Sequence, residues 1–311
     1  MANSLSYDVI IVGAGPAGLT AAIYSVRAGL STLILEGQQV GGQVAISAEI
    51  ENYPGAPRTT GWQLASAMDR QVRDMAVPIR HEAVRAIADL GRKKQVVTTA
   101  DTYTAGALIL ANGVKRRKLG CPGEEALFGR GVSYCATCDG AFFRGRDTAV
   151  AGGGNTAVED AVYLAGLCRS VHLIYRREEL TAQKPLIAAA KSRENLHLHP
   201  CTQIAAIRGG EAVEAVVLTG TQDKSETVLP VSGVFIAIGL EPDNGIFAPA
   251  VALDAAGYLL AGEDCKTSCP GIFCAGDART KPLRQIVTAA SDGAVAAMQA
   301  ERYLAALDSE A

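Results

Sequence analysis

The amino-acid sequence predicts an α/β protein with two similar units, and three observations lead to this fold class. The chain has 311 residues, which suggests two domains at ~150 residues each. A short apolar strand, a glycine-rich turn and a helix follow one another twice, first from residue 7 and again from residue 147. Hydrophobic residues make up 49% of the chain and charged residues 20%, a composition that excludes a disordered protein.

The first unit opens with residues 7–12, a β-branched apolar run of the kind that lies buried in a parallel sheet. A glycine-rich turn follows at 13–18, and the small apolar residues 19–28 predict a helix that ends at Gly29. Residues 31–36 predict the next strand. Together these elements make one complete βαβ unit.

The second unit repeats this order in the middle of the chain. It has a strand at 147–151, a glycine turn at 152–157, a helix at 158–167 and a strand at 170–175. The remaining elements expected are strands at 95–99, 107–111, 212–219 and 233–238, a strand leading into a loop at 271–277, and an alanine-rich helix at 284–307.

The charge balance excludes two classes of partner. The chain carries 29 Lys and Arg against 32 Asp and Glu, a formal net charge of −3, so no basic field holds nucleic acid or an anionic membrane.

Residues 9–26 carry no charge and approach the length of a membrane-spanning helix. Three glycines and a proline interrupt them and no basic residue precedes them, so we expect neither a membrane span nor a signal peptide, and a cytoplasmic protein.

The first glycine turn has the spacing of a dinucleotide-binding site. Gly13 permits a tight turn, Gly15 lets the backbone approach a diphosphate, and Gly18 allows the helix to pack closely on the strand. Glu36 ends the next strand, where a carboxylate accepts hydrogen bonds from ribose hydroxyls. The alternative interpretation is a purely structural glycine-rich turn.

The second glycine turn predicts a different nucleotide. Gly152, Gly154 and Ala157 repeat the pattern, but Arg176 and Arg177 stand where the first unit has its acid. A carboxylate repels a 2′-phosphate, whereas guanidinium groups bind it with charge-assisted hydrogen bonds. These two arginines therefore favour NADP at this turn; the alternative is a solvated basic strand end.

Two cysteines with C-x-x-C spacing, Cys135 and Cys138, lie shortly before the second turn. Such thiols close a small disulfide and often have a low pKa, and the adjacent Asp139 could supply or accept the proton that thiol–disulfide exchange requires. A zinc half-site with Cys265 and Cys269 and an inert buried pair are the alternatives. Most of the other cysteines are expected to be small buried hydrophobic residues.

A polar group precedes the last predicted helix. Asp277 could bind a sugar-alcohol chain, and the helix amino terminus, placed at a flavin ring, would favour its anionic reduced form. Without further information, Asp277 could equally be a cap or turn residue.

These motifs together resemble the low-molecular-weight thioredoxin reductases over almost the whole chain. The most specific segments are Cys-Ala-Thr-Cys-Asp-Gly at 135–140, Gly-Gly-Gly-Asn-Thr-Ala-Val-Glu at 152–159 and Gly-Asp at 276–277. Residues 41–43 and 51–55 also match the flavin-binding region of that family.

The resemblance implies two Rossmann-like dinucleotide-binding domains, one inserted in the other, and a homodimer. FAD would bind a domain formed by residues 1–117 and 245–311, and NADPH would bind residues 118–244, which carry the dithiol. No metal is expected. The cofactor-binding residues implied are Gly13, Gly15, Pro16, Ala17, Gly18, Glu36, Gly42, Gln43, Asn52, Gly113, Asp277, Arg284, Gln285, Ile286, Gly152, Gly154, Asn155, Thr156, Ala157, Arg176 and Arg177.

The resemblance also assigns catalytic roles. Cys138 would be the thiol nearest the flavin, Cys135 would attack thioredoxin, and Asp139 would transfer protons. Electrons would pass from NADPH through FAD and the dithiol to thioredoxin.

The family's NADPH signature is His-Arg-Arg, three residues and a further Arg, and this chain departs from it. Here Tyr175 replaces the His and Thr181 replaces the last Arg. Losing one charged contact to a phosphate costs about 1.5–3 kcal/mol, so NADH or reduced ferredoxin remain alternative electron donors. A flavin reductase that serves a one-electron carrier, and a non-catalytic redox sensor, are the remaining alternatives.

Overall fold

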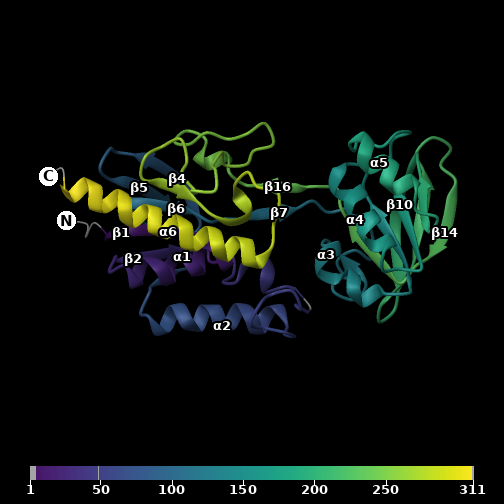
Figure 1. Ribbon diagram of the computed structural model, residues 1–311, viewed down its shortest axis with the longest axis horizontal. Helices are drawn as coiled ribbons and strands as arrows, with labels where there is room; N and C mark the ends of the chain where they lie inside the picture. The colour runs from purple at the N-terminus through teal and green to yellow at the C-terminus, as the bar shows by residue number, and fades with distance from the viewer. Residues whose placement is uncertain (1–4, 48, 310–311) are drawn as a thin grey trace. The chain divides into compact units, whose positions relative to one another are not determined.

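A computed structural model describes residues 5–47 and 49–309, and the chain divides into two compact units (Figure 1). The first unit combines Met1–Lys115 with Glu241–Ala311, and the second is the continuous segment Arg116–Leu240. The resemblance implies domain boundaries after residue 117 and after residue 244, whereas these two units divide after residue 115 and after residue 240. Among the residues described, no helix combines the length and apolar character needed to cross a bilayer.

The first unit is an α/β sandwich around one sheet. The strand order is β3-β2-β1-β6-β5-β4, and β17 also pairs with β6. Its helices and strands are β1 (Leu5–Val12), α1 (Pro16–Arg27), β2 (Thr32–Leu35), η1 (Gly42–Val44), α2 (Gly61–Asp74), β3 (Ile79–Arg80), β4 (Val84–Asp89), β5 (Lys94–Thr98), β6 (Thr102–Leu110), β7 (Val114–Arg116), β16 (Leu240–Pro242), η3 (Gly245–Phe247), β17 (Ile272–Cys274), η4 (Gly276–Ala278) and α6 (Ile286–Ser309).

Strand β1 lies at the centre of the first sheet, parallel to β2 on one side and to β6 on the other. Its residues alternate between two cores: Val9 and Ile11 pack with α1 and α6, whereas Ile10 and Val12 pack on the opposite face with Phe247. Both faces are therefore covered, which explains why the strand is a continuous apolar run rather than an alternating one.

Helices α1 and α6 pack closely against each other on one face of this sheet (Figure 1). Small residues permit this approach: a Cβ atom at Gly293 would lie 2.2 Å from the Ala17 carbonyl oxygen, and one at Gly276 would lie 2.9 Å from the Ala17 Cβ. The glycine turn at the start of α1 is thereby brought next to the segment that precedes α6.

The second unit contains a parallel sheet of order β11-β10-β9-β15-β8 and an antiparallel sheet of order β12-β13-β14. Val150 of the central strand faces the helix core with Ala161, and Ala149 faces the antiparallel sheet with Val216. The elements are β8 (Val132–Ser133), α3 (Ala136–Asp139), η2 (Gly140–Phe143), β9 (Asp147–Ala151), α4 (Asn155–Ala165), β10 (Ser170–Ile174), α5 (Lys184–Lys191), β11 (Leu196–His199), β12 (Thr202–Gly209), β13 (Val213–Gly220), β14 (Glu226–Pro230) and β15 (Gly233–Ile236).

The two βαβ units predicted from the sequence are confirmed, with small shifts at their ends. Helix α1 begins at Pro16 rather than at residue 19, because proline is well suited to the first helical position. Helix α4 likewise begins at Asn155, directly after the glycine turn.

Candidate functional site

Two glycines of the first turn are required by the fold itself. Gly13 has φ +105°, and a Cβ atom there would lie 2.3 Å from the Ala111 carbonyl oxygen. A Cβ atom at Gly18 would lie 1.9 Å from the Gly13 carbonyl oxygen. No side chain fits at either position, so both glycines serve the contact between β1, α1 and β6.

Gly15 differs, because a Cβ atom there would meet no atom within 4 Å. It caps the amino terminus of α1, which has Pro16 in its first turn and no side-chain cap. The space over this residue is open, and the next N–H groups, at Ala17 and Gly18, belong to the first turn of the helix. An uncapped helix amino terminus of this kind binds anions such as phosphate.

The Glu36 carboxylate is fixed beside this turn. Its side chain is buried, and its two oxygens accept hydrogen bonds from the backbone N–H groups of Ala14 and Gln38, both at 2.7 Å. A carboxylate can accept about four hydrogen bonds, so acceptor capacity remains for a ribose hydroxyl.

The segment from residue 42 to residue 60 brings further predicted residues to this side of the unit. A Cβ atom at Gly42, in η1 next to Gln43, would lie 3.4 Å from the Gly15 Cα atom. Asn52 donates a hydrogen bond from Nδ2 to Gln285 Oε1 at 3.1 Å. These residues are thus gathered from distant parts of the chain.

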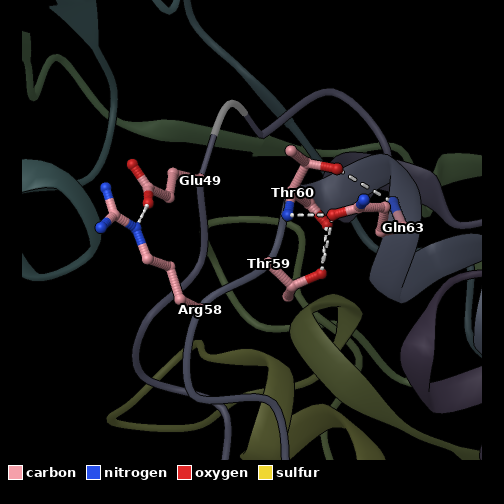
Figure 2. A pocket seen from close by; sticks show the side chains of 5 residues that line it. All are labelled: Glu49, Arg58, Thr59, Thr60 and Gln63. Carbon is pink, nitrogen blue, oxygen red and sulfur yellow. Dashed lines mark hydrogen bonds and ion pairs between the residues drawn. The ribbon is translucent and has the colours of Figure 1, made fainter.

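A polar pocket of about 350 Å³ lies at the base of this segment (Figure 2). Thr60 and Gln63 form a capping box at the start of α2, with the Gln63 N–H donating to Thr60 Oγ1 at 3.2 Å. Arg58 pairs with Glu49, and Thr59 contacts Gln63 at 3.3 Å. Because these side chains bond mainly to one another, we assign the pocket a structural role.

The segment before α6 holds the remaining predicted residues of the first unit. Asp277 lies in η4, Arg284 donates to the carbonyl oxygens of Asp277 and Arg279 at 3.3 Å, and Ile286 is the first residue of α6. The Arg284 guanidinium also lies 4.2 Å from the centre of the Tyr258 ring. Gly113, between β6 and β7, has φ +67°.

A buried charge cluster, not expected from the sequence, supports this segment. Asp292 of α6 accepts hydrogen bonds from the Gly276 N–H at 2.9 Å, from Arg279 at 2.9 Å and from Lys281 at 2.8 Å. Burial alone would raise the pKa of Asp292, but the two cations outweigh it and the pKa lies below its ordinary value. One carboxylate therefore holds two buried cations and the backbone of η4.

The second glycine turn has the same design as the first. Gly152 has φ +142°, and a Cβ atom there would lie 2.4 Å from the Ala237 carbonyl oxygen and 2.8 Å from the Ala157 Cβ. Gly154 caps α4 without a side-chain cap, and the nearest atom to its Cβ would be Thr181 Oγ1 at 4.0 Å. Here too, the glycine at the helix cap faces open space.

The surroundings of this second turn are more exposed. Arg176, Arg177 and Thr156 are exposed to solvent, whereas Tyr175 is buried. Thr181, at the position of the family's last arginine, bonds to the Gly153 carbonyl oxygen through its N–H at 2.8 Å and its hydroxyl at 3.1 Å. Asn155, the other predicted residue here, accepts a hydrogen bond through Oδ1 from the Gln183 N–H at 2.9 Å.

Cys135 and Cys138 form a disulfide at the start of α3, with their Cα atoms 5.3 Å apart. Cys135 is the N-cap residue of this short helix, and its Sγ atom lies 3.5 Å from Thr137 Oγ1. The zinc alternative is not supported, because the two sulfurs are joined to each other and, within the described part of the chain, no group of three or more His, Cys, Asp or Glu could hold a metal ion.

Asp139 ends α3, immediately after the disulfide. Burial raises the pKa of this carboxyl above its ordinary range, while a hydrogen bond from Ser133 and the charge of Arg116 act in the opposite direction. A carboxyl whose pKa is raised keeps its proton to a higher pH than an ordinary aspartate, which suits it to proton transfer.

Three histidines form a cluster on the neighbouring strands β10 and β11. His172 Nδ1 lies 3.0 Å from His199 Nε2, and the ring centres of His172 and His197 are 5.1 Å apart. Burial lowers the pKa of His172 to about 4, with His199 and His197 adding to the effect and Asp147 opposing it. The sequence did not indicate this cluster, because it depends on the register of β11.

The comparisons with known proteins agree with this geometry. A family model described as pyridine nucleotide-disulphide oxidoreductase matches residues 7–293. The thioredoxin reductase of Mycolicibacterium smegmatis is 45% identical over 304 residues, which cover 97% of this chain and 98% of the relative. The bifunctional thioredoxin reductase/thioredoxin of Mycobacterium leprae is 43% identical over 307 residues, 98% of this chain and 67% of the relative.

A solved structure shows the same likeness in three dimensions. The crystal structure of thioredoxin reductase from Streptococcus pyogenes matches with a TM-score of 0.93 at 39% identity, covering 98% of this chain and 100% of that one. The chain therefore belongs to the pyridine nucleotide-disulphide oxidoreductase family, and it is an oxidoreductase. Its resemblance to the low-molecular-weight thioredoxin reductases and its fold of two dinucleotide-binding domains are confirmed. Family membership implies FAD and a pyridine nucleotide.

Proposed function

We propose that this protein is an NADPH-dependent thioredoxin reductase in which the first unit binds FAD and the second binds NADPH and carries the dithiol. One observation carries the proposal: the Cys135–Cys138 disulfide lies next to a half-buried carboxyl, Asp139, in the same unit as the second glycine turn. A nucleotide site and a redox-active dithiol on one unit are two of the parts that such an enzyme requires, and the flavin site of the first unit is the third.

The residues around Gly15 fit FAD. Open space and uncapped N–H groups at the start of α1 suit a diphosphate, and the fixed Glu36 carboxylate suits ribose hydroxyls. Asn52, Asp277 and Gln285 are further polar residues of this unit that would hold the cofactor. When bound, FAD supplies a two-electron carrier between the pyridine nucleotide and the dithiol.

The second turn fits a pyridine nucleotide by the same argument, and its arginines favour the phosphorylated form. Arg176 and Arg177 are exposed beside the turn, free of burial that would hinder a ligand phosphate. Thr181 supplies no charge. We therefore expect a preference for NADPH over NADH that is weaker than in a protein with arginine at all three positions.

The dithiol would act by exchange with thioredoxin. The Cys135 thiolate attacks one sulfur of the thioredoxin disulfide, a mixed disulfide forms, and the other thioredoxin sulfur leaves as a thiolate and is protonated. The Cys138 thiolate then attacks Cys135 Sγ, which restores the enzyme disulfide and releases the second thioredoxin thiol. The enzyme dithiol loses two electrons and the thioredoxin disulfide gains them, and Asp139 carries the protons from enzyme thiols to leaving thiolates.

The partner and the compartment follow from separate observations. The relatives are named thioredoxin reductases, and one of them combines this activity with thioredoxin in a single chain. Six further cysteines are free, which suits the reducing conditions of a cytoplasm. By the resemblance we also propose a homodimer, which sedimentation of the purified holoenzyme would test.

Trapping the mixed disulfide tests the cysteine roles. The probe is a thioredoxin that lacks its second cysteine and carries a thionitrobenzoate group in disulfide linkage on the first. Cys138→Ser should displace thionitrobenzoate as the leaving thiolate and form a stable mixed disulfide with this thioredoxin, whereas Cys135→Ser should form none. Cys121 is a free cysteine of the same unit. The Cys121→Ser variant is therefore the matched control and should reduce thioredoxin at the normal rate. Normal thioredoxin reduction by Cys135→Ser would overturn the proposal and favour a flavin reductase or a redox sensor.

A reductive titration of the holoenzyme identifies the electron donor. Stoichiometric NADPH should bleach the flavin absorbance more readily than NADH. If only reduced ferredoxin bleaches it, the dithiol assignment stands but the donor is ferredoxin.

A further inference from the structure

Ser133 is a buried residue that the proposed mechanism has not used. It ends β8, the strand that leads directly into the dithiol, and its backbone is held opposite Phe235 of β15. Its exposed fraction is only 3%. A hydroxyl buried to this extent must find hydrogen-bond partners.

Both partners of this hydroxyl belong to the dithiol segment. Ser133 Oγ donates to Asp139 Oδ2 at 2.5 Å and accepts the Cys135 N–H at 3.1 Å. The Cys135 carbonyl oxygen is farther away, at 3.4 Å. Because a hydroxyl has a single hydrogen, the short contact assigns that hydrogen to the carboxylate. One side chain therefore connects the backbone of Cys135 to the carboxyl of Asp139.

The hydrogen bond opposes what burial does to Asp139. Burial raises the pKa of Asp139, and the Ser133 hydroxyl counteracts that rise together with the charge of Arg116. A second carboxyl of raised pKa lies on α4, the helix that packs against α3: burial raises the pKa of Asp160 to about 7, and its neighbour Glu159 adds to this. A test must separate the two carboxyls.

We propose that Ser133 is a positioning residue, whose hydroxyl holds the Asp139 carboxyl in place at the end of α3 and favours the ionised form of that carboxyl. The inference rests on the proposed role of Asp139 in proton transfer. A merely structural role would need only the bond to the Cys135 N–H, which is a local turn contact. Only the positioning role predicts that the ionisation of Asp139 changes when the hydroxyl is lost.

Infrared titration of the oxidised holoenzyme measures this ionisation directly, with the Asp139 band assigned by subtracting Asp139→Asn and the Asp160 band by subtracting Asp160→Asn. Since a hydrogen bond to a charged group corresponds to about one pKa unit or more, Ser133→Ala should move the Asp139 midpoint upward by at least about that amount. Ser133→Thr and Ser133→Val form an isosteric pair: the first should keep the wild-type midpoint and the second should shift it. Ser192→Ala, which removes an exposed hydroxyl at the end of α5, should change nothing.

The pH profile of thioredoxin reduction by the pre-reduced enzyme should shift by the same amount in Ser133→Ala and Ser133→Val. An unchanged Asp139 midpoint in both variants would overturn the inference, even if activity fell. A wild-type protein that does not reduce thioredoxin, but whose Asp139 midpoint still depends on Ser133, would refute the proposed function while the link between the two residues stands. The Thr and Val pair decides the question if the alanine variant does not fold.

Discussion

The two glycine turns share one geometry but differ in what surrounds them. In both turns, backbone atoms leave no room for a side chain at the first glycine, Gly13 or Gly152. Gly15 and Gly154, by contrast, face open space. The first turn is closed in by a buried carboxylate, Glu36, that bonds to the turn itself. The second is followed by two exposed arginines.

The difference indicates how each ligand would be held. Buried, fixed groups suit a cofactor that stays in place, because they are already ordered before it binds. Exposed arginines suit a substrate that comes and goes, because their side chains must be ordered at each encounter. The following predictions test this contrast, beginning with the largest expected effect.

Gly15→Val should abolish FAD binding and leave the protein folded. The backbone at Gly15 has φ −78°, which valine accepts, and the added side chain would fill the open space over the helix cap. Loss of two charge-assisted bonds to a diphosphate costs about 3–6 kcal/mol. Flavin absorbance of the purified protein measures the effect. Gly154→Val is the matched variant: it should keep its flavin and lose reduction by NADPH, and a yellow Gly15→Val protein would contradict the assignment.

Asp292→Asn should destabilise the first unit by about 3–5 kcal/mol, because Lys281 would lose its buried carboxylate and Arg279 would keep only the exposed Glu263. Among the described residues of the second unit, no buried carboxylate pairs with buried cations in this way. Urea unfolding followed by far-ultraviolet circular dichroism measures the change. The exposed Asp74→Asn should alter the free energy of unfolding by less than about 0.5 kcal/mol. Equal effects of both substitutions would refute the role of the cluster.

Acid should weaken the second unit selectively. The pKa of His172 falls from 6.5 when unfolded to about 4 when folded, so its contribution to stability is fully present above pH 6.5 and is lost as the pH falls toward 4. At about pH 4.5 the loss is about 2–3 kcal/mol. Hydrogen exchange in β10 and β11, compared with β1 and β2, measures it. His172→Asn should remove this pH dependence, and His81→Asn, at an exposed position of the first unit, should not.

Thr181→Arg should give the smallest of these effects, a gain in NADPH affinity of about 1.5–3 kcal/mol with NADH affinity unchanged. The reason is that position 181 lies directly over the second turn. Dissociation constants of both nucleotides measured on the oxidised holoenzyme check it. Equal gains for both nucleotides would show that the arginine does not contact the 2′-phosphate.

Local sequence patterns were sufficient to predict both βαβ units and the strands that flank them. The glycine spacing, the apolar runs and the helix ends are properties of short segments, and they act wherever they occur. Helix α2 was missed although Thr60 and Gln63 have the spacing of a capping box. The strands β4, β12 and β14 were missed because their antiparallel pairing leaves much of each strand exposed, without a strong apolar run.

Interactions between distant segments could not be predicted from the sequence. The bond between His172 and His199 depends on the register of β10 and β11. The contact between Asn52 and Gln285 joins residues separated by most of the chain. Asp292 becomes a buried counterion only because α6 packs against η4. In each case the partner is selected by tertiary packing, which no local pattern specifies.

The strands that connect the units have a consequence for engineering. The chain leaves the first unit through β7 and returns through β16, and these two strands pair with each other. Paired strands lie about 4.8 Å apart, so the ends of the segment 116–240 are neighbours. A few added residues would join the flanking halves once that segment is cut out, and the thiol-bearing module could be transplanted between relatives as one uninterrupted cassette.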